Sequence, residues 1–339
     1  MTDPNLSASQ PLPQKPKKTE SSISQREKSE GADPVGTQAA ELSTVYEEGL
    51  EVKARSQWQL AFRRFLRHKL AVASLILLLL IFAAGIFAGQ IAPYSFREQV
   101  PLDARLAPTL EGQHYFGTDV LGRDYFSRTL FGIQTSIRVA LLVALLSTLI
   151  GTVIGSISGY FVGWIDNLLM RFVDLILTLP ILAVLLVIAA LAGQGSPTRV
   201  AIILALFFWT TLARIIRGNF LSLREKEYVE AAKASGASDM RIIFRHMLPN
   251  SFGPIIVNAT LIVATAILVE ATLSFLGFGV QPPTPALGKL IDDNRGFMTS
   301  LPWLVIAPGA TIVAMVLCIN FVGDGLRDAL DPTQRRLRA

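Results

Sequence analysis

Residues 70–92, LAVASLILLLLIFAAGIFAGQIA, decide the fold class because the stretch contains no charged residue. A helix needs about 20 apolar residues to cross the roughly 30 Å hydrocarbon core of a bilayer, so this stretch can span a membrane. Arg63, Arg64, Arg67 and Lys69 stand directly before it. Because the cytoplasmic flanks of membrane helices are rich in Lys and Arg, we expect the N-terminal end to lie in the cytoplasm.

Five further apolar runs follow this stretch. They cover about Ile133 to Tyr160, Leu168 to Leu191, Val200 to Ile216, Phe252 to Leu276 and Trp303 to Val322. Only 17% of the 339 residues are charged, compared with about 25% in soluble domains. The sequence therefore predicts an all-α membrane protein with six transmembrane helices, in a membrane domain at residues 70–325.

The charges of the loops between these runs predict the orientation. Residues 217–250 and the C-terminal tail at residues 326–339 are rich in Lys and Arg, whereas residues 93–132 hold four Arg against five Asp and Glu. Six spans with the basic segments inside place both the N-terminus and the C-terminus in the cytoplasm. The same basic flanks explain the net charge of +5 without a nucleic-acid partner.

Two segments precede the first span. Residues 1–43 are polar and lack the apolar core of a signal peptide, so we expect a disordered cytoplasmic tail. Residues 44–69 place Trp58 and Phe65 among basic residues. This mixture is typical of a helix that lies at the membrane interface in contact with lipid.

The sequence does not indicate a metal site or a disulfide. Cys318 is the only cysteine and lies in an apolar run, which excludes a disulfide framework or a thiolate metal site within the chain. His68, His114 and His246 fall in different loops on the two sides of the predicted membrane. We therefore expect neither a metal nor a cofactor to be bound by this chain.

The predicted cytoplasmic loop carries the most informative pattern, LSLREKEYVEAAKASGASDMRIIFRHMLPN at residues 221–250. Ser222 meets the spacing of a capping box and should begin a helix. Gly236 can adopt the positive φ that ends one, and Ser238 can cap a second short helix. Pro249 should end that second helix before the fifth span.

Glu230, Ala231 and Ala232 could form a docking face on the first of these helices. The two alanines allow another backbone to approach closely, and the Glu230 carboxylate can meet a basic partner. An ordinary amphipathic surface helix explains the same residues without any partner. The spacing alone leaves both interpretations open.

The loop resembles the EAA motif of the permeases of ATP-binding-cassette importers. The matching positions are Glu230, Ala231, Ala232, Gly236, Leu248 and Pro249. His246 stands where the general pattern has isoleucine. A His-x-Leu-Pro-Asn ending is typical of the oligopeptide and dipeptide branch of the family, so the departure makes the resemblance more specific.

Other stretches are similar to the same branch, and the resemblance covers about residues 55–335. They are FGTD at 116–119, LGRD at 121–124, LSFLG at 273–277, QPPTP at 281–285 and GDGLRDALDP at 323–332. Together they resemble the C-type permease of an oligopeptide or dipeptide importer.

The resemblance implies the type I importer permease fold in the bacterial cytoplasmic membrane. A homologous second permease should pair with this chain, and two cytoplasmic ATPases should use ATP and Mg. An extracytoplasmic solute-binding protein should deliver the peptide substrate. The loop at 222–250 should be the coupling helix that docks on an ATPase. The chain itself has no G-x-x-x-x-G-K-[ST] motif, so we expect no ATP hydrolysis by it.

Four glycines in the second run and one carboxylate in the fifth are further candidates. Gly151, Gly155, Gly159 and Gly163 are four residues apart, which predicts one helix face where another helix packs closely. That helix could belong to this subunit, or to the partner permease as a moving contact. Glu270 could line the pathway or pair with a neighbouring helix, because ionisable groups inside spans are functional candidates.

Other functions are compatible with part of the pattern. A permease for nickel chelates or glutathione would have the same architecture and related motifs. A stand-alone secondary transporter predicts inverted repeats and discontinuous helices, and no repeat between the two halves is visible. A structural or receptor membrane protein would not require the arrangement at 222–250.

Overall fold

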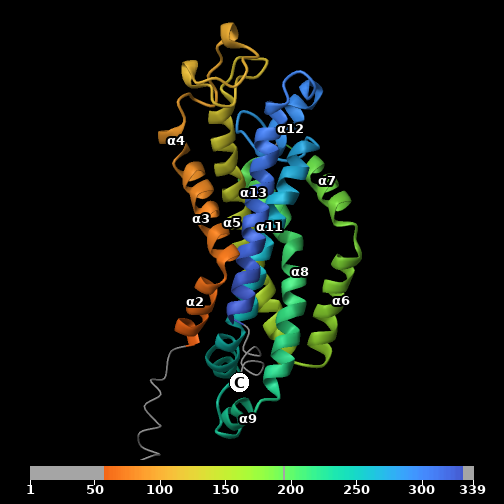
Figure 1. Cartoon of the computed structure of the whole chain (residues 1–339). Helices are drawn as coiled ribbons and strands as arrows, with labels where there is room; N and C mark the ends of the chain where they lie inside the picture. Colours follow the sequence, from red (N-terminus) through yellow and green to blue (C-terminus); the bar gives the residue numbers. More distant parts are fainter. Residues whose placement is uncertain (1–56, 194, 331–339) are drawn as a thin grey trace, which may run out of the picture. The chain divides into compact units, whose positions relative to one another are not determined.

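The computed structural model describes residues 57–193 and 195–330 (Figure 1). The helices among them are α2 Gln57–Arg67, α3 Lys69–Ile86, α4 Ala88–Ile91, α5 Tyr125–Tyr160, α6 Trp164–Thr178, α7 Ile181–Leu191, α8 Pro197–Arg224, α9 Glu227–Ala234, α10 Asp239–Ile242, α11 Phe252–Phe275, α12 Leu287–Asn294 and α13 Trp303–Leu330. Within this part of the chain the only β-structure is two isolated bridges.

Five helical segments are long and apolar enough to cross a membrane, and a sixth is counted if α6 and α7 form one span. The axes of α6 and α7 differ by 86°. Pro180 causes the break, because proline lacks the amide hydrogen of a helix and forces Leu179 into an extended conformation. The predicted third run, Leu168 to Leu191, is therefore two helices.

The long helices α5 and α8 pack closely through three of the four predicted glycines. A methyl group on Gly151, Gly155 or Gly159 would lie 2.5 to 2.8 Å from an atom of α8. The packing is therefore within this subunit. Gly163 does not share the contact, because α5 ends at Tyr160 and Gly163 lies before α6 with a positive φ of 119°. A methyl group on Gly163 would meet no atom within 4 Å.

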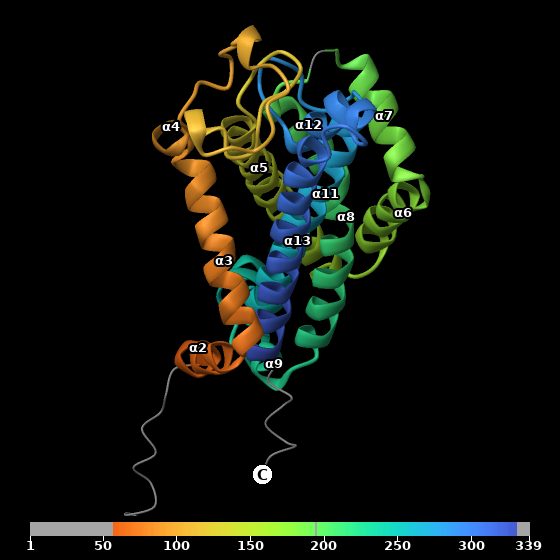
Figure 2. The same ribbon diagram turned by 45° about the horizontal axis from the view of Figure 1, so that its top comes forward.

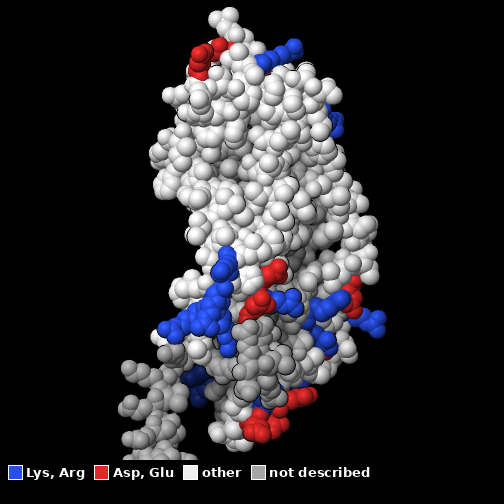
Figure 3. All heavy atoms as spheres, viewed as in Figure 1, with Lys and Arg blue, Asp and Glu red and all other residues white. Residues whose placement is uncertain are grey.

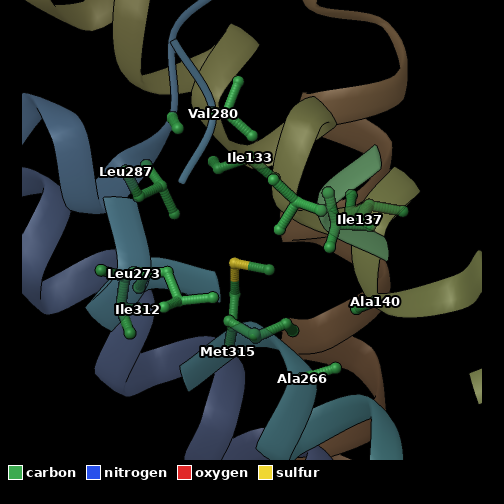
Figure 4. Packing of buried hydrophobic residues seen from close by; sticks show 14 of the residues in the cluster. Ile133, Ile137, Ala140, Ala266, Leu273, Val280, Leu287, Ile312 and Met315 are labelled. Atoms are coloured by element: carbon green, nitrogen blue, oxygen red, sulfur yellow. The ribbon is translucent and has the colours of Figure 1, made fainter. Parts of the chain in front are cut away.

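The main apolar core lies where α5, α11, α12 and α13 meet (Figure 4). Its side chains include Ile133, Ile137, Ala266, Leu273, Leu287, Ile312 and Met315. Val280, in the loop between α11 and α12, also points into this cluster. The core therefore binds the loop after α11 to the spanning helices.

The described helices give bounds near both ends of the predicted domains. The helix expected at residues 44–69 appears as α2 from Gln57, and the remainder of that prediction and the tail at 1–43 lie outside the described residues. The tail expected at 326–339 begins inside α13, which continues to Leu330. Close packing of Gly325 against Ala71 and Phe65 explains the extra helical turn.

The two ends of the helical body differ in the elements that they carry. The α9 end carries α9, α10 and the residues that lead into α11, and the α12 end carries α12 and the loop before α5 (Figures 1 and 2). Figure 3 shows charged side chains gathered toward these ends, with an uncoloured belt between them on that face. Such a belt is expected of a protein surrounded by lipid.

Candidate functional site

The segment at the α9 end begins differently from the prediction. The helix α8 continues through Ser222 to Arg224, so Ser222 caps no helix. The helix α9 begins after Lys226, which makes no side-chain cap. The prediction of a capping box at Ser222 is therefore wrong. Phe220 is buried in the packing of α8, and the helix continues past Ser222.

Gly236 ends α9 as the sequence predicts. Its φ is +76°, the left-handed conformation that glycine adopts without the strain of a side chain. The amide of Ala237 donates to the carbonyl of Ala232 at 3.1 Å, and the amide of Gly236 donates to that of Lys233 at 3.0 Å. These two bonds form a Schellman cap, which turns the chain from α9 toward α10.

The underside of this segment is attached to the spanning helices by apolar contacts. Val229, Ile242 and Met247 are fully buried. They pack in one cluster with Tyr160 at the end of α5 and Phe220 of α8. The segment that carries α9 and α10 is therefore in direct apolar contact with α5 and α8.

A polar contact joins the same segment to α5. The Tyr160 hydroxyl donates to Asp239 Oδ1 at 2.6 Å, and Lys233 Nζ lies 5.6 Å from the centre of the Tyr160 ring. Tyr160 thus contacts both helices of the segment. This link could not be read from the sequence, because the hydroxyl and its acceptor are 79 residues apart.

The opposite face of the segment is open. Glu230, Ala231 and Gly236 are exposed, while Ala232 is half-buried. Three large apolar side chains, Tyr228, Met240 and Phe244, are 41% to 62% exposed beside them. Acidic side chains gather over the tip of α9 in Figure 3. The motif residues therefore share the exposed surface of this segment with large apolar side chains.

The last motif residues lie where the segment turns into α11. His246 is in a π-helical turn, Ile243–Met247, and Leu248 is half-buried against the apolar cluster. Pro249 begins a short turn before α11. The Asn250 side chain donates to the His246 carbonyl at 2.6 Å and lies 3.4 Å from the Tyr228 hydroxyl. Burial raises the pKa of that hydroxyl.

Ion pairs brace α6 against α8 near this end. Arg217 holds Asp166 through two hydrogen bonds of 2.6 and 2.7 Å, and Ser158 of α5 donates to the same carboxylate. Arg214 pairs with Asp174 at 2.5 Å. Asp174 is thus paired with a residue of another helix, although Arg171 stands three residues before it in its own helix.

Glu270 is fully buried between α5 and α11. The Ser136 hydroxyl donates to one carboxylate oxygen at 3.0 Å, and the Ser274 hydroxyl donates to the other at 2.7 Å. The amide of Val280 donates to Ser274 Oγ at 3.1 Å. The carboxyl group therefore joins two spanning helices and the loop after α11, and it has no exposed surface in this subunit.

Buried charges organise the α12 end, in the stretch that contains the FGTD and LGRD motifs. Asp119 is fully buried and accepts from Arg123 Nε and Arg128 Nη1, each at 2.7 Å. Asp124 caps α5 and bonds His114 at 2.9 Å. The motifs were visible in the sequence, but these pairings needed the tertiary structure.

A pocket of ≈ 410 Å³ lies beside these charges, between the loop before α5 and α12. Arg97, Arg123, Arg128, Lys289 and Asp293 contribute to its lining. The Lys289 ammonium group donates hydrogen bonds to Asp292 and Asp293, and these bonds raise the pKa of Lys289. Most of the pocket's charge is therefore balanced by nearby carboxylates.

Two protein families match this chain. The family described as the binding-protein-dependent transport system inner membrane component matches residues 151–336. The N-terminal TM domain of oligopeptide transport permease C matches residues 56–108. Together the matches include the α9 segment and the helices α3, α8, α11 and α13, but only the last ten of the 36 residues of α5.

Curated proteins of the same family are similar over most of the chain. The dipeptide transport system permease protein DppC of Alkalihalophilus pseudofirmus is 42% identical, with 83% of this chain and 92% of the relative covered. The oligopeptide transport system permease protein OppC of Mycobacterium bovis is 43% identical, with coverage of 84% and 97%. The glutathione transport system permease protein GsiD of Shigella dysenteriae is 40% identical, with coverage of 83% and 92%.

These matches agree with the helical structure, the apolar belt and the resemblance seen in the sequence. The family is a transport component and not a catalytic enzyme. The chain belongs to the family of binding-protein-dependent transport system inner membrane components, as a multi-pass permease subunit in a bacterial inner membrane.

Proposed function

We propose that this chain is one of two membrane-spanning subunits of an ATP-driven importer of oligopeptides or dipeptides. The names of the relatives at 42% and 43% identity support peptides as the cargo. The observation that carries the coupling role is the segment at the α9 end, whose underside is buried and whose motif face is open.

The proposal includes the orientation and the partners. The basic flanks of the spans support six crossings, with α6 and α7 as one broken span and both termini in the cytoplasm. A homologous permease completes the pathway, and an extracytoplasmic binding protein delivers the peptide at the α12 end. Two ATPases at the α9 end bind and hydrolyse ATP with Mg.

The α9 segment couples the ATPases to the pathway by mechanical contact. Glu230, Ala231, Gly236 and the exposed Phe244 form the surface that enters a groove on an ATPase. Closure of the ATPases moves this surface. The buried Val229 and the bond from Tyr160 to Asp239 then transmit the displacement to α5 and α8.

Glutathione is a second candidate cargo of the same architecture. The relative named as a glutathione permease is 40% identical over 83% of this chain. Glutathione carries the amide and carboxylate groups of a peptide, so one pathway chemistry can serve both. Competition by glutathione against peptide uptake distinguishes the two cargoes.

The test uses the complete importer in proteoliposomes, with ATP-dependent uptake of a labelled peptide and recovery of the ATPases as readouts. Gly236→Val puts a β-branched residue where φ is +76°, which is unfavourable by about 1–2 kcal/mol. We expect uptake to fall at least about fivefold, because that strain disrupts the turn from α9 to α10.

Gly218→Ala is the matched control, because a methyl group at this position of α8 meets no atom within 4 Å. Its uptake should equal that of the unmodified importer. Unchanged uptake and unchanged ATPase recovery with Gly236→Val would overturn the coupling role of this segment.

A further inference from the structure

One face of α5 carries a cation that has no ionic partner among residues 57–193 and 195–330. Arg138 is exposed and forms no hydrogen bond or ion pair with any described residue. Gln134, one helical turn away on the same face, is half-buried and also has no partner within the described residues. Leu141 and Leu145 continue this face and are 51% and 57% exposed.

Arg138 lies deep in the apolar belt. Gly85 of α3 packs against Ile133 of α5, so these residues share one level. Arg138 is five residues further along α5, roughly 7.5 Å deeper. Lys69, at the start of α3, lies roughly 24 Å from the level of Gly85. The guanidinium is therefore attached roughly 16 Å from the level of Lys69, in the middle of a membrane about 30 Å thick.

A charge at this depth is unfavourable in lipid and is expected where a wet cavity or a partner receives it. Two other arginines of the spanning helices, Arg214 and Arg217 of α8, are paired within the subunit, because each contacts a carboxylate of α6. The helices packed against α5 carry acids such as Glu270 of α11 and Asp166 of α6, but within the described residues none of them pairs with Arg138. A face of α5 that borders the pathway between the two permeases would give the guanidinium such an environment.

We propose that Arg138, with Gln134 beside it, binds the terminal carboxylate of a peptide in transit. This inference rests on the proposed peptide importer. The planar guanidinium presents paired donors that match a carboxylate, and the Gln134 amide adds a further donor. Every unmodified peptide carries this carboxylate whatever its sequence, so one Arg can serve substrates with different side chains.

The test compares a labelled peptide with its C-terminal amide, chosen so that the binding protein holds both forms. Uptake of each form is measured with the complete importer in proteoliposomes. In the unmodified importer we expect the acid to be transported about three to ten times faster than the amide, the range of a charge-assisted contact weakened by water. Arg138→Gln should lower the ratio to about one by slowing the acid alone.

Because the ratio is taken within one preparation, it does not depend on how much of a variant folds. Arg138→Lys should keep a ratio above one, since the positive charge remains. Arg171→Gln is the matched control, an exposed arginine of the spanning helix α6, and should leave the ratio unchanged.

Three outcomes would overturn the proposal. An unchanged ratio in Arg138→Gln means that the guanidinium meets lipid phosphate. Equal slowing of both forms means that it pairs with a permanent acid of the partner permease. Absence of peptide uptake by the unmodified importer refutes the proposed function, whereas normal uptake with either of the first two results refutes only this site.

Discussion

Different interactions stabilise the two ends of the molecule. At the α12 end, the buried Asp119 joins Arg123 and Arg128 in a network of ion pairs. At the α9 end, the segment that follows α8 is attached by apolar side chains such as Val229 and leaves its other face open. Ion pairs require a defined geometry, so they hold the α12 end in one arrangement. The α9 segment can move as a unit without breaking a buried ion pair.

This difference fits the tasks proposed for the two ends. An end that receives a binding protein benefits from a rigid outline, because preorganised surfaces lose less entropy on binding. An end that transmits motion needs close packing against the spanning helices and an exposed surface that can bind the partner. Removal of single contacts at each end tests this comparison.

The largest effect is expected from Asp119→Asn at the α12 end. The substitution removes the close ionic partner of Arg128, whose side chain is 7% exposed, and leaves it only the Asp293 carboxylate at 3.9 Å. Breaking a buried pair by removing one partner is destabilising by about 3–5 kcal/mol. Thermal unfolding of the purified subunit in detergent should show a marked fall in the midpoint.

Asp292→Asn is the control for that measurement. Its partner Lys289 keeps a second carboxylate at 3.0 Å, on Asp293, and the site is partly exposed. The expected loss is at most about 1 kcal/mol. Equal shifts for the two variants would contradict the claim that buried charges hold the α12 end.

A smaller and local effect is expected from Val229→Asp in α9. A carboxylate at this fully buried position is unfavourable without a partner, so α9 should detach while the spanning helices stay folded. Limited trypsin cleavage at Lys226 and Lys233 should accelerate about tenfold with little change in the unfolding midpoint.

Ala234→Asp places the same charge on an exposed position of α9 and should leave the cleavage rate unchanged. If Val229→Asp instead lowered the unfolding midpoint as strongly as Asp119→Asn, the α9 segment would be part of the main core and not a separate moving unit.

The smallest effect is expected from Tyr160→Phe, which removes the hydrogen bond to Asp239. Loss of a bond to a partly exposed charged group weakens attachment by about 1 kcal/mol. Amide hydrogen exchange in residues 239–247 should accelerate about fivefold. Tyr228→Phe, whose hydroxyl lies 3.4 Å from the Asn250 side chain, should change exchange much less.

The sequence predicted features that depend on local patterns. The apolar runs located the spanning helices, and the turn at Gly236 follows from the conformational freedom of glycine. Pro180 was a visible signal for the break between α6 and α7, but the uninterrupted apolar composition around it favoured one helix. Ser222 failed as a cap because the packing of Phe220 extends α8.

Pairings between distant segments could not be predicted in the same way. Ser136 and Glu270 are 134 residues apart, and the choice of Arg214 over Arg171 by Asp174 depends on how α6 lies against α8. Arg138 carried no local pattern that singled it out. Its importance follows from depth and from the absence of a partner within the described residues, which only the packed helices reveal.

Site-directed cross-linking tests the central claim, that the open face at the α9 end docks on an ATPase. Cys318 is the chain's only cysteine, so Cys318→Ala gives a clean background. Two single-cysteine variants are made in this background, Ala231→Cys on α9 and Leu110→Cys at the α12 end, where Leu110 is 82% exposed. Each variant is assembled into the complete importer and treated with a thiol-to-amine cross-linker. We predict that Ala231→Cys cross-links to an ATPase with a yield that changes on ATP addition, while Leu110→Cys yields no such product. A product with Leu110→Cys and none with Ala231→Cys would contradict the account.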